Sequence, residues 1–190
     1  DLHLLSRRQR QMCIRDRLSS MTNAPGTIVK EAVKMEKMLV SGVAKDTNVA
    51  RISVVGVPDV PGLAFKLFSK LASKGINVDI ILQSIGRDGT KDIAFTVAKE
   101  NGKEAVAIME DFISVVGGKS VTLSEDVAKI SIVGAGMESH AGVATKMFEA
   151  LFDAQINIQM ISTSEIKVSV LINADDADKA VSAIHSKFFD

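Results

Sequence analysis

The chain has 190 residues, with 23 basic and 23 acidic side chains, so its formal net charge is zero. Such a chain has no overall field to attract nucleic acid or an anionic membrane, and no apolar run approaches the roughly 20 residues that span a bilayer. A single cysteine, Cys13, excludes an intrachain disulfide framework and favours a reducing cytoplasm. Nucleic-acid-binding, membrane and disulfide-stabilised classes are therefore disfavoured, and a small neutral or zwitterionic partner fits better.

Residues 1–17 differ in composition from the rest of the chain. The segment from Arg7 to Arg17 is strongly basic and has neither a helical apolar stripe nor the apolar region of a signal peptide. It is either a basic interaction arm or a disordered or foreign leader, and its composition favours the leader. Because the chain begins with Asp1 instead of methionine, we expect a fragment of a longer protein.

Residues 49–125 predict a first α+β module. β-branched runs indicate strands, apolar residues at helical spacing indicate helices, and Asp88-Gly89 supplies the backbone freedom of a hairpin turn. The predicted order is strand 51–57, helix 63–74, strand 77–83, strand 92–98, helix 101–116 and strand 120–123. This βαββαβ order is typical of the ferredoxin-like unit, an antiparallel sheet with both helices on one face.

Residues 126–190 repeat this module. The segment 50–57 (ARISVVGV) returns at 128–135 (AKISIVGA), and 75–81 (GINVDII) returns at 155–161 (QINIQMI). The second copy lacks a final strand, whereas the linker segment 18–48 contains an apolar stretch at about 38–44 that neither copy uses. We expect this stretch to add the missing edge strand to one of the two sheets.

Motifs for catalysis and metal binding are absent or weak. The string 134–139 (GAGMES) lacks the third glycine of a dinucleotide loop, and the matching loop in the first module contains prolines that remove backbone donors. There is no phosphate-binding lysine loop, nucleophile elbow, cysteine pair or helical histidine pair. An RNA-recognition domain would need stacking aromatics, and the central strands offer only Phe95. We therefore predict no catalytic residue and no metal site.

The loops that open the first helix of each module are the best candidate sites. The first amides of a helix have no intrahelical acceptor and lie at the positive end of its dipole, which suits a carboxylate. In the first module these donors are Gly62, Leu63 and Ala64, and Asp59 either meets an α-ammonium group or caps the helix. In the second module Ser139 is a candidate cap in the turn before Val143. Asn77 and Asn157 open strands, where asparagine is also common simply as a turn residue.

Five strings, 58–62, 75–79, 132–137, 139–143 and 161–166, together resemble the C-terminal regulatory region of aspartate kinase, a tandem pair of ACT domains. The likeness runs from about residue 18 to residue 190. It implies feedback control: such ACT pairs bind lysine, threonine or both and restrain the phosphorylation of aspartate by ATP. It also implies that ATP and Mg²⁺ belong to a kinase lobe outside this chain, which itself needs no cofactor.

The resemblance also implies two effector sites, each shared between modules. The first would use Asp59, Pro61, Gly62, Leu63, Ala64 and Gln83, closed by Asn157 and Ile158. The second would use Met137, Ser139, His140, Gly142 and Val143 with Asn77, Val78 and Asp79, and would be lined by Thr163, Ser164 and Glu165. A lysine side chain would favour a carboxylate such as Asp79 or Glu165, whereas threonine needs only a hydroxyl partner such as Gln83.

The family resemblance further implies a homodimer whose ACT sheets join edge to edge, together with a kinase lobe or catalytic subunit as partner. Catalysis by this chain alone is not expected. The chain is either a fragment of an intact aspartokinase or a separately translated regulatory subunit. A structural dimerisation module without a ligand, or the amino-acid sensor of another biosynthetic enzyme, are the alternatives.

Overall fold

The computed structural model describes residues 14–16, 27–29, 40–84, 88–134 and 140–189. The chain divides into two compact units, Asp1–Met38 and Leu39–Asp190. In the first unit, strand β1 (Ile14–Asp16) pairs with antiparallel strand β2 (Thr27–Val29). Strand β1 therefore falls within the segment that we expected to be a disordered leader.

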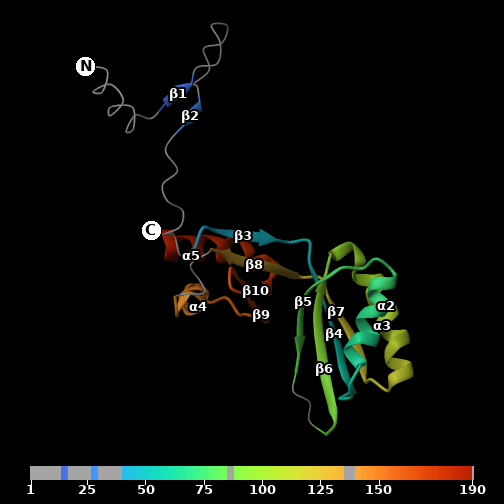
Figure 1. Cartoon of the computed structure of the whole chain (residues 1–190). Helices are drawn as coiled ribbons and strands as arrows, with labels where there is room; N and C mark the ends of the chain where they lie inside the picture. Colours follow the sequence, from blue (N-terminus) through green and yellow to red (C-terminus); the bar gives the residue numbers. More distant parts are fainter. Residues whose placement is uncertain (1–13, 17–26, 30–39, 85–87, 135–139, 190) are drawn as a thin grey trace, which may run out of the picture. The chain divides into compact units, whose positions relative to one another are not determined.

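The second unit holds two modules, and module 1 (residues 49–125) has the predicted βαββαβ order. Its strands β4 (Ala50–Pro58), β5 (Val78–Gln83), β6 (Thr90–Val97) and β7 (Ser120–Ser124) form an antiparallel sheet in the order β5-β6-β4-β7. Helices α2 (Leu63–Ser73) and α3 (Gly102–Val116) cover one face of this sheet, and a short 3₁₀ turn, η3 (Lys99–Asn101), precedes α3 (Figure 1).

The core of module 1 lies between this sheet and its two helices. Side chains alternate along β4, so that Ile52 and Val54 are fully buried against the helices, where they meet Leu67 and Leu71 of α2. Fully burying one such side chain contributes about 1.5–3 kcal/mol relative to leaving it exposed. The hairpin between β5 and β6 has positive φ at Asp88 (56°) and Gly89 (72°), as the Asp-Gly pair predicts.

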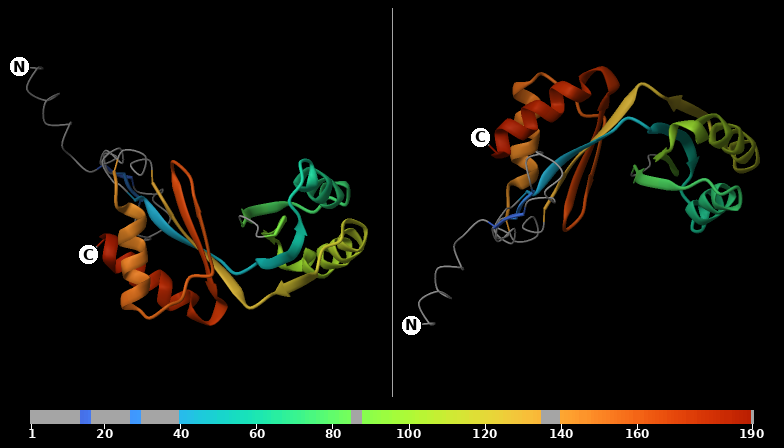
Figure 2. Two further views of the ribbon diagram at one scale, coloured as in Figure 1. Left: turned by 90° about the horizontal axis from the view of Figure 1, so that it is seen from below. Right: turned by 90° about the horizontal axis from the view of Figure 1, so that it is seen from above.

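Module 2 (residues 126–190) repeats the arrangement and borrows its last strand. It contains β8 (Val127–Val133), α4 (Val143–Asp153), β9 (Met160–Thr163), β10 (Lys167–Asn173), the turn η4 (Ala174–Asp176) and α5 (Ala177–Phe189). Strand β3 (Gly42–Asp46) pairs antiparallel with β8, giving the order β3-β8-β10-β9. Figure 2 shows α4 and α5 on one side of this sheet. Part of the apolar stretch expected at about 38–44 thus lies in the strand that module 2 lacks, which spans residues 42–46.

Both sheets confirm the α+β prediction of two ferredoxin-like modules. Strand β3 lies beside β8 as β7 lies beside β4. In both modules this strand covers an edge of the module's first strand. Strand β9 starts later than predicted, at Met160 instead of Asn157. The preceding helix ends through Gln155, which has φ 55°, where module 1 uses Gly75 with φ 73°.

A small apolar cluster joins the two modules. It contains Val49 and Ile80 from module 1 and Val127, Met160 and Leu171 from module 2, all nearly fully buried. Ile80 lies on β5, and Met160 is the first residue of β9. The beginnings of these two equivalent strands therefore lie at the contact between the modules, which we call the junction.

Candidate functional site

The two helix openings that the sequence offers as candidate sites share one geometry. Helix α2 begins after Gly62 (φ 83°) and helix α4 after Gly142 (φ 96°), and neither start has a side-chain cap. Asp59 therefore does not cap α2, which was one of its two possible roles. Residues 59–62 and 140–142 are exposed, so a ligand can approach both openings. Met137 and Ser139 lie outside the described residues.

Asp59 instead forms an ion pair with Lys91, a residue that sequence reasoning missed. The Lys91 Nζ lies 3.0 Å from Asp59 Oδ1, and the Lys91 side chain is only 9% exposed whereas that of Asp59 is 55% exposed. Lys91 follows the same two-residue alternation as Ile93 and Phe95, which face the helices. This alternation is the signal that could have identified Lys91 as an inward-pointing residue beside the opening of α2.

Strand register places Gln83 toward the opening of α2 and Asn77 at the opposite end of the sheet. Gln83 pairs with Ile93, and the Asp59 amide donates to the Gly89 carbonyl at the end of β6 where the loop lies. Val78, next to Asn77, pairs with Val97 at the other end of β6. Thr90 and Val97 are seven positions apart along β6, a span of about 23 Å.

Module 2 separates its predicted site residues in the same way. The Gly134 amide donates to the Ile166 carbonyl (3.0 Å), and Thr163 pairs with Val168, so the exposed residues Thr163, Ser164 and Glu165 lie at the end of the sheet where the loop before α4 begins. Asn157 and Ile158 lie at the other end, because the amide of neighbouring Gln159 donates to the Leu171 carbonyl.

Each chain therefore brings together part of each predicted site. At one end of module 1, Gln83 lies with the residues of the first helix opening, which are Asp59, Pro61, Gly62, Leu63 and Ala64. At one end of module 2, residues 163–165 lie with those of the second helix opening, which are His140, Gly142 and Val143. Asn77, Val78, Asp79, Asn157 and Ile158 lie toward the junction. Within one chain, the strand openings are therefore at the opposite end of their own sheets from the helix openings.

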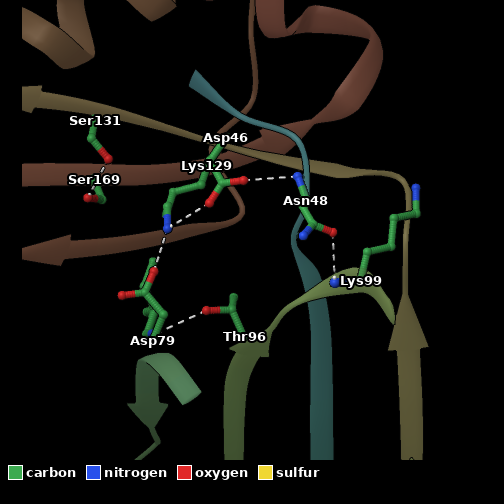
Figure 3. Close-up of polar contacts among 9 residues, drawn as sticks. Asp46, Asn48, Asp79, Thr96, Lys99, Lys129, Ser131 and Ser169 are labelled. Atoms are coloured by element: carbon green, nitrogen blue, oxygen red, sulfur yellow. Dashed lines mark hydrogen bonds and ion pairs between the residues drawn. The ribbon is translucent and has the colours of Figure 1, made fainter. Parts of the chain in front are cut away.

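A polar network surrounds the junction (Figure 3). Lys129, on β8, places its Nζ 2.5 Å from Asp79 Oδ2 and 3.1 Å from Asp46 Oδ2. The Asn48 amide donates to Asp46 Oδ1 (2.9 Å), and Asn48 Oδ1 accepts from the Lys99 amide (3.3 Å). The Lys129 side chain is 15% exposed, so its ammonium group is largely withdrawn from water.

The charges in this network stabilise one another. The hydrogen bond from Lys129 holds the pKa of Asp79 below its ordinary value of 3.8, although burial acts in the opposite direction. Burial acts to lower the pKa of Lys129, but its hydrogen bonds to Asp79 and Asp46 outweigh burial and raise this pKa above 10.5. Asp79 and Lys129 are consequently both charged near neutral pH.

A cavity of about 370 Å³ opens beside this network. It is lined by polar groups from both modules and the connecting segment, among them Asn48, Asn77, Asp79, Thr96 and Lys129. The volume lies within the range of small-molecule pockets. Asn77 and Asp79, predicted from the sequence as ligand contacts, thus border a cavity.

The described residues contain neither a cluster of three metal-ligating side chains nor a helix long and apolar enough to cross a membrane. His140 lies in the exposed turn before α4, and Cys13 is outside the described residues.

Comparison with known proteins matches both modules separately to the ACT domain, over residues 50–117 and 130–188. The aspartokinase of Mycolicibacterium smegmatis is 47% identical over 175 residues, which cover 90% of this chain and 42% of that protein. The chain therefore spans less than half the length of this relative.

Two solved structures are similar over nearly their whole length. The ligand-free regulatory subunit of aspartate kinase from Thermus thermophilus is 42% identical, with a TM-score of 0.75 over 80% of this chain and 99% of that chain. A structure of aspartokinase alpha and beta subunits is 45% identical, with a TM-score of 0.74 over 78% of this chain and 98% of that chain. The paired ACT domains and these matches show that the chain belongs to the aspartate kinase family, as the regulatory ACT region of such an enzyme.

Proposed function

We propose that this chain is a cytoplasmic feedback sensor that binds lysine, threonine or both and thereby controls the phosphorylation of L-aspartate by ATP. The kinase lobe or catalytic subunit on which it acts would supply the ATP and Mg²⁺ sites. The observation that carries this proposal is the pair of exposed, uncapped helix openings, one in each ACT module. Such openings bind carboxylates through free amides and the helix dipole.

The opening of α2 is complementary to an amino-acid zwitterion. Lys91 adds a nearly buried ammonium group to the positive helix end, while the half-exposed carboxylate of Asp59 lies 3.0 Å from it. A free amino acid can lie antiparallel to this ion pair, with its carboxylate toward Lys91 and the amides of Leu63 and Ala64 and its α-ammonium toward Asp59. This arrangement gives both Lys91 and Asp59 a role in the proposed site.

Completion of each site requires a second copy of the chain. The helix openings lie at the opposite end of their sheets from Asn77 and Asn157, so the loop of one copy must receive the strand opening of another. We therefore propose a homodimer in which Asn157 and Ile158 close over the Asp59 loop, and Asn77, Val78 and Asp79 close over the turn at Gly142. Ligand binding would stabilise the dimer because each ligand contacts both copies.

The two sites offer different groups to the ligand's side chain. Gln83 lies toward the opening of α2 and can hydrogen-bond the hydroxyl group of threonine. Glu165 is exposed near the turn before α4 and suits the ε-ammonium group of lysine. We propose threonine for the first site and lysine for the second.

Isothermal titration calorimetry with lysine and threonine, combined with sedimentation at matched protein concentrations, tests this proposal. We expect saturable heat, a shift toward dimer, and loss of threonine binding in Asp59→Asn. Asp111→Asn, an exposed carboxylate on α3, is the matched control and should bind normally. The absence of heat and of any thermal shift at millimolar concentrations of both ligands would contradict the sensor and support a purely structural module.

A further inference from the structure

Lys129 forms an ion pair that connects the two modules. Its partners come from different parts of the chain: Asp46 lies directly opposite it on β3, and Asp79 belongs to β5 of module 1. Within the part of the chain that the structure describes, Lys129–Asp79 is the one ion pair that joins module 1 to module 2. The exposed fractions are 15% for Lys129 and 46% for Asp79, so the bridge is partly shielded from water.

The pairing of β5 with β6 is irregular at the same place. The pairing is interrupted between Val78 and Ile81, and the Ile80 amide donates to the Thr96 side-chain hydroxyl instead of a strand carbonyl (3.0 Å). A bulge of this kind loosens and bends the bulged strand. The position of Asp79 therefore depends on Lys129 as well as on the sheet.

We propose that Lys129 is a positioning residue for effector binding, which fixes the opening of β5 in the conformation that closes the partner copy's site. This inference rests on the proposed function, because it assumes that Asn77, Val78 and Asp79 contact the ligand. In this proposal Lys129 acts on the ligand through Asp79. It holds Asp79 against module 2 and so links the ligand contacts to the arrangement of the two modules.

The physical reason is that Lys129 neutralises two neighbouring carboxylates and thereby keeps residues 77–79 ordered. Without the Lys129 ammonium, the carboxylates of Asp46 and Asp79 would both face the junction cavity with no cation between them, and their repulsion would move Asp79 toward solvent. The ligand would then have to order residues 77–79 when it binds, and this ordering reduces its affinity. A coupling of ordinary size corresponds to a change of about 5- to 150-fold in affinity, and we expect about tenfold.

Calorimetry of the full chain with threonine and lysine, in wild type and three variants, tests the proposal. Lys129→Met removes the ammonium group and retains an apolar stem of similar length, whereas Lys129→Arg retains a cation. Lys45→Met is the matched control, because Lys45 also pairs with an aspartate, Asp178, but this pair joins β3 to α5 and does not reach module 1. We expect Lys129→Met to weaken binding at the site closed by residues 77–79 about tenfold, Lys129→Arg to restore most of the affinity, and Lys45→Met to have no effect.

A double variant separates positioning from general stability. The loss of affinity in the double variant of Lys129→Met and Asp79→Asn should be smaller than the sum of the two single losses, because both substitutions remove the same bridge. If Lys129→Met does not fold, Lys129→Gln, which also lacks the cation, takes its place in this comparison. Wild-type affinity in a folded Lys129→Met chain would overturn this inference and leave the sensor intact, whereas failure of the unmodified chain to bind either ligand would overturn both. Equal losses in Lys129→Met and Lys129→Arg would also contradict a role for the cation.

Discussion

The ion pair between Asp59 and Lys91 predicts an asymmetric response to mutation. Lys91 is nearly buried, whereas Asp59 is half-exposed. Replacing Asp59 with asparagine leaves a buried ammonium group without its anion, and a residual buried charge is costly. Replacing Lys91 with methionine removes the buried charge and retains an apolar stem, and such replacements are often neutral or stabilising.

We therefore expect Asp59→Asn to lower the free energy of unfolding by about 1–2 kcal/mol, a value reduced from that of a fully buried pair because the carboxylate is exposed to solvent screening. Lys91→Met should change stability by less than about 1 kcal/mol, and the double variant should recover most of the loss caused by Asp59→Asn. Urea unfolding followed by circular dichroism measures all three. A large loss in Lys91→Met together with no loss in Asp59→Asn would refute this reasoning.

Three further predictions follow from the described contacts. Because the pKa of Asp79 is lowered in the folded chain, the Lys129–Asp79 bridge should stabilise the protein above about pH 4 and lose this contribution as pH falls through the lowered pKa. In acid unfolding experiments, the free energy of unfolding of Lys129→Met should therefore depend less on pH than that of the wild type. Gly62→Ala should lower the free energy of unfolding by about 1 kcal/mol, because φ is 83° at this residue. Urea unfolding measures this loss, and an unchanged free energy of unfolding would contradict the left-handed residue at the start of α2. Leu67→Ala should cost about 2–5 kcal/mol because this side chain is fully buried, and an unchanged melting curve would contradict the assigned core.

The fold was predictable because its patterns are local. Alternation along β4 and helical spacing from Leu63 to Leu71 set the elements of module 1, and the repeat then located the elements of module 2. The partner strand for β8 could be inferred only from an absence, because β3 is far from β8 in sequence and nothing in its residues names its neighbour. The stretch predicted at about 38–44 accordingly overlaps β3, which spans Gly42–Asp46, only in part.

The candidate site was less predictable because it depends on register and on distant contacts. Asp59 was identified from its loop, but its partner Lys91 appears only when the two-residue alternation of β6 is followed into the turn. Asp79 was expected to be available to a ligand, whereas the structure pairs it with Lys129, 50 residues away. No sequence pattern indicates that pairing, because it arises from the packing of one module on the other.

The central claim is that each effector site combines the helix opening of one copy with the strand opening of another, and complementation between two defective chains tests it most directly. Asp59→Asn damages the loop, and Asn157→Ala damages the strand opening that closes it. We predict that each variant alone fails to bind threonine in calorimetry, whereas an equimolar mixture regains binding, because a mixed dimer contains one intact loop facing one intact strand opening. If the mixture binds no better than either variant alone while mixed dimers form, the site lies within a single chain and the claim is wrong.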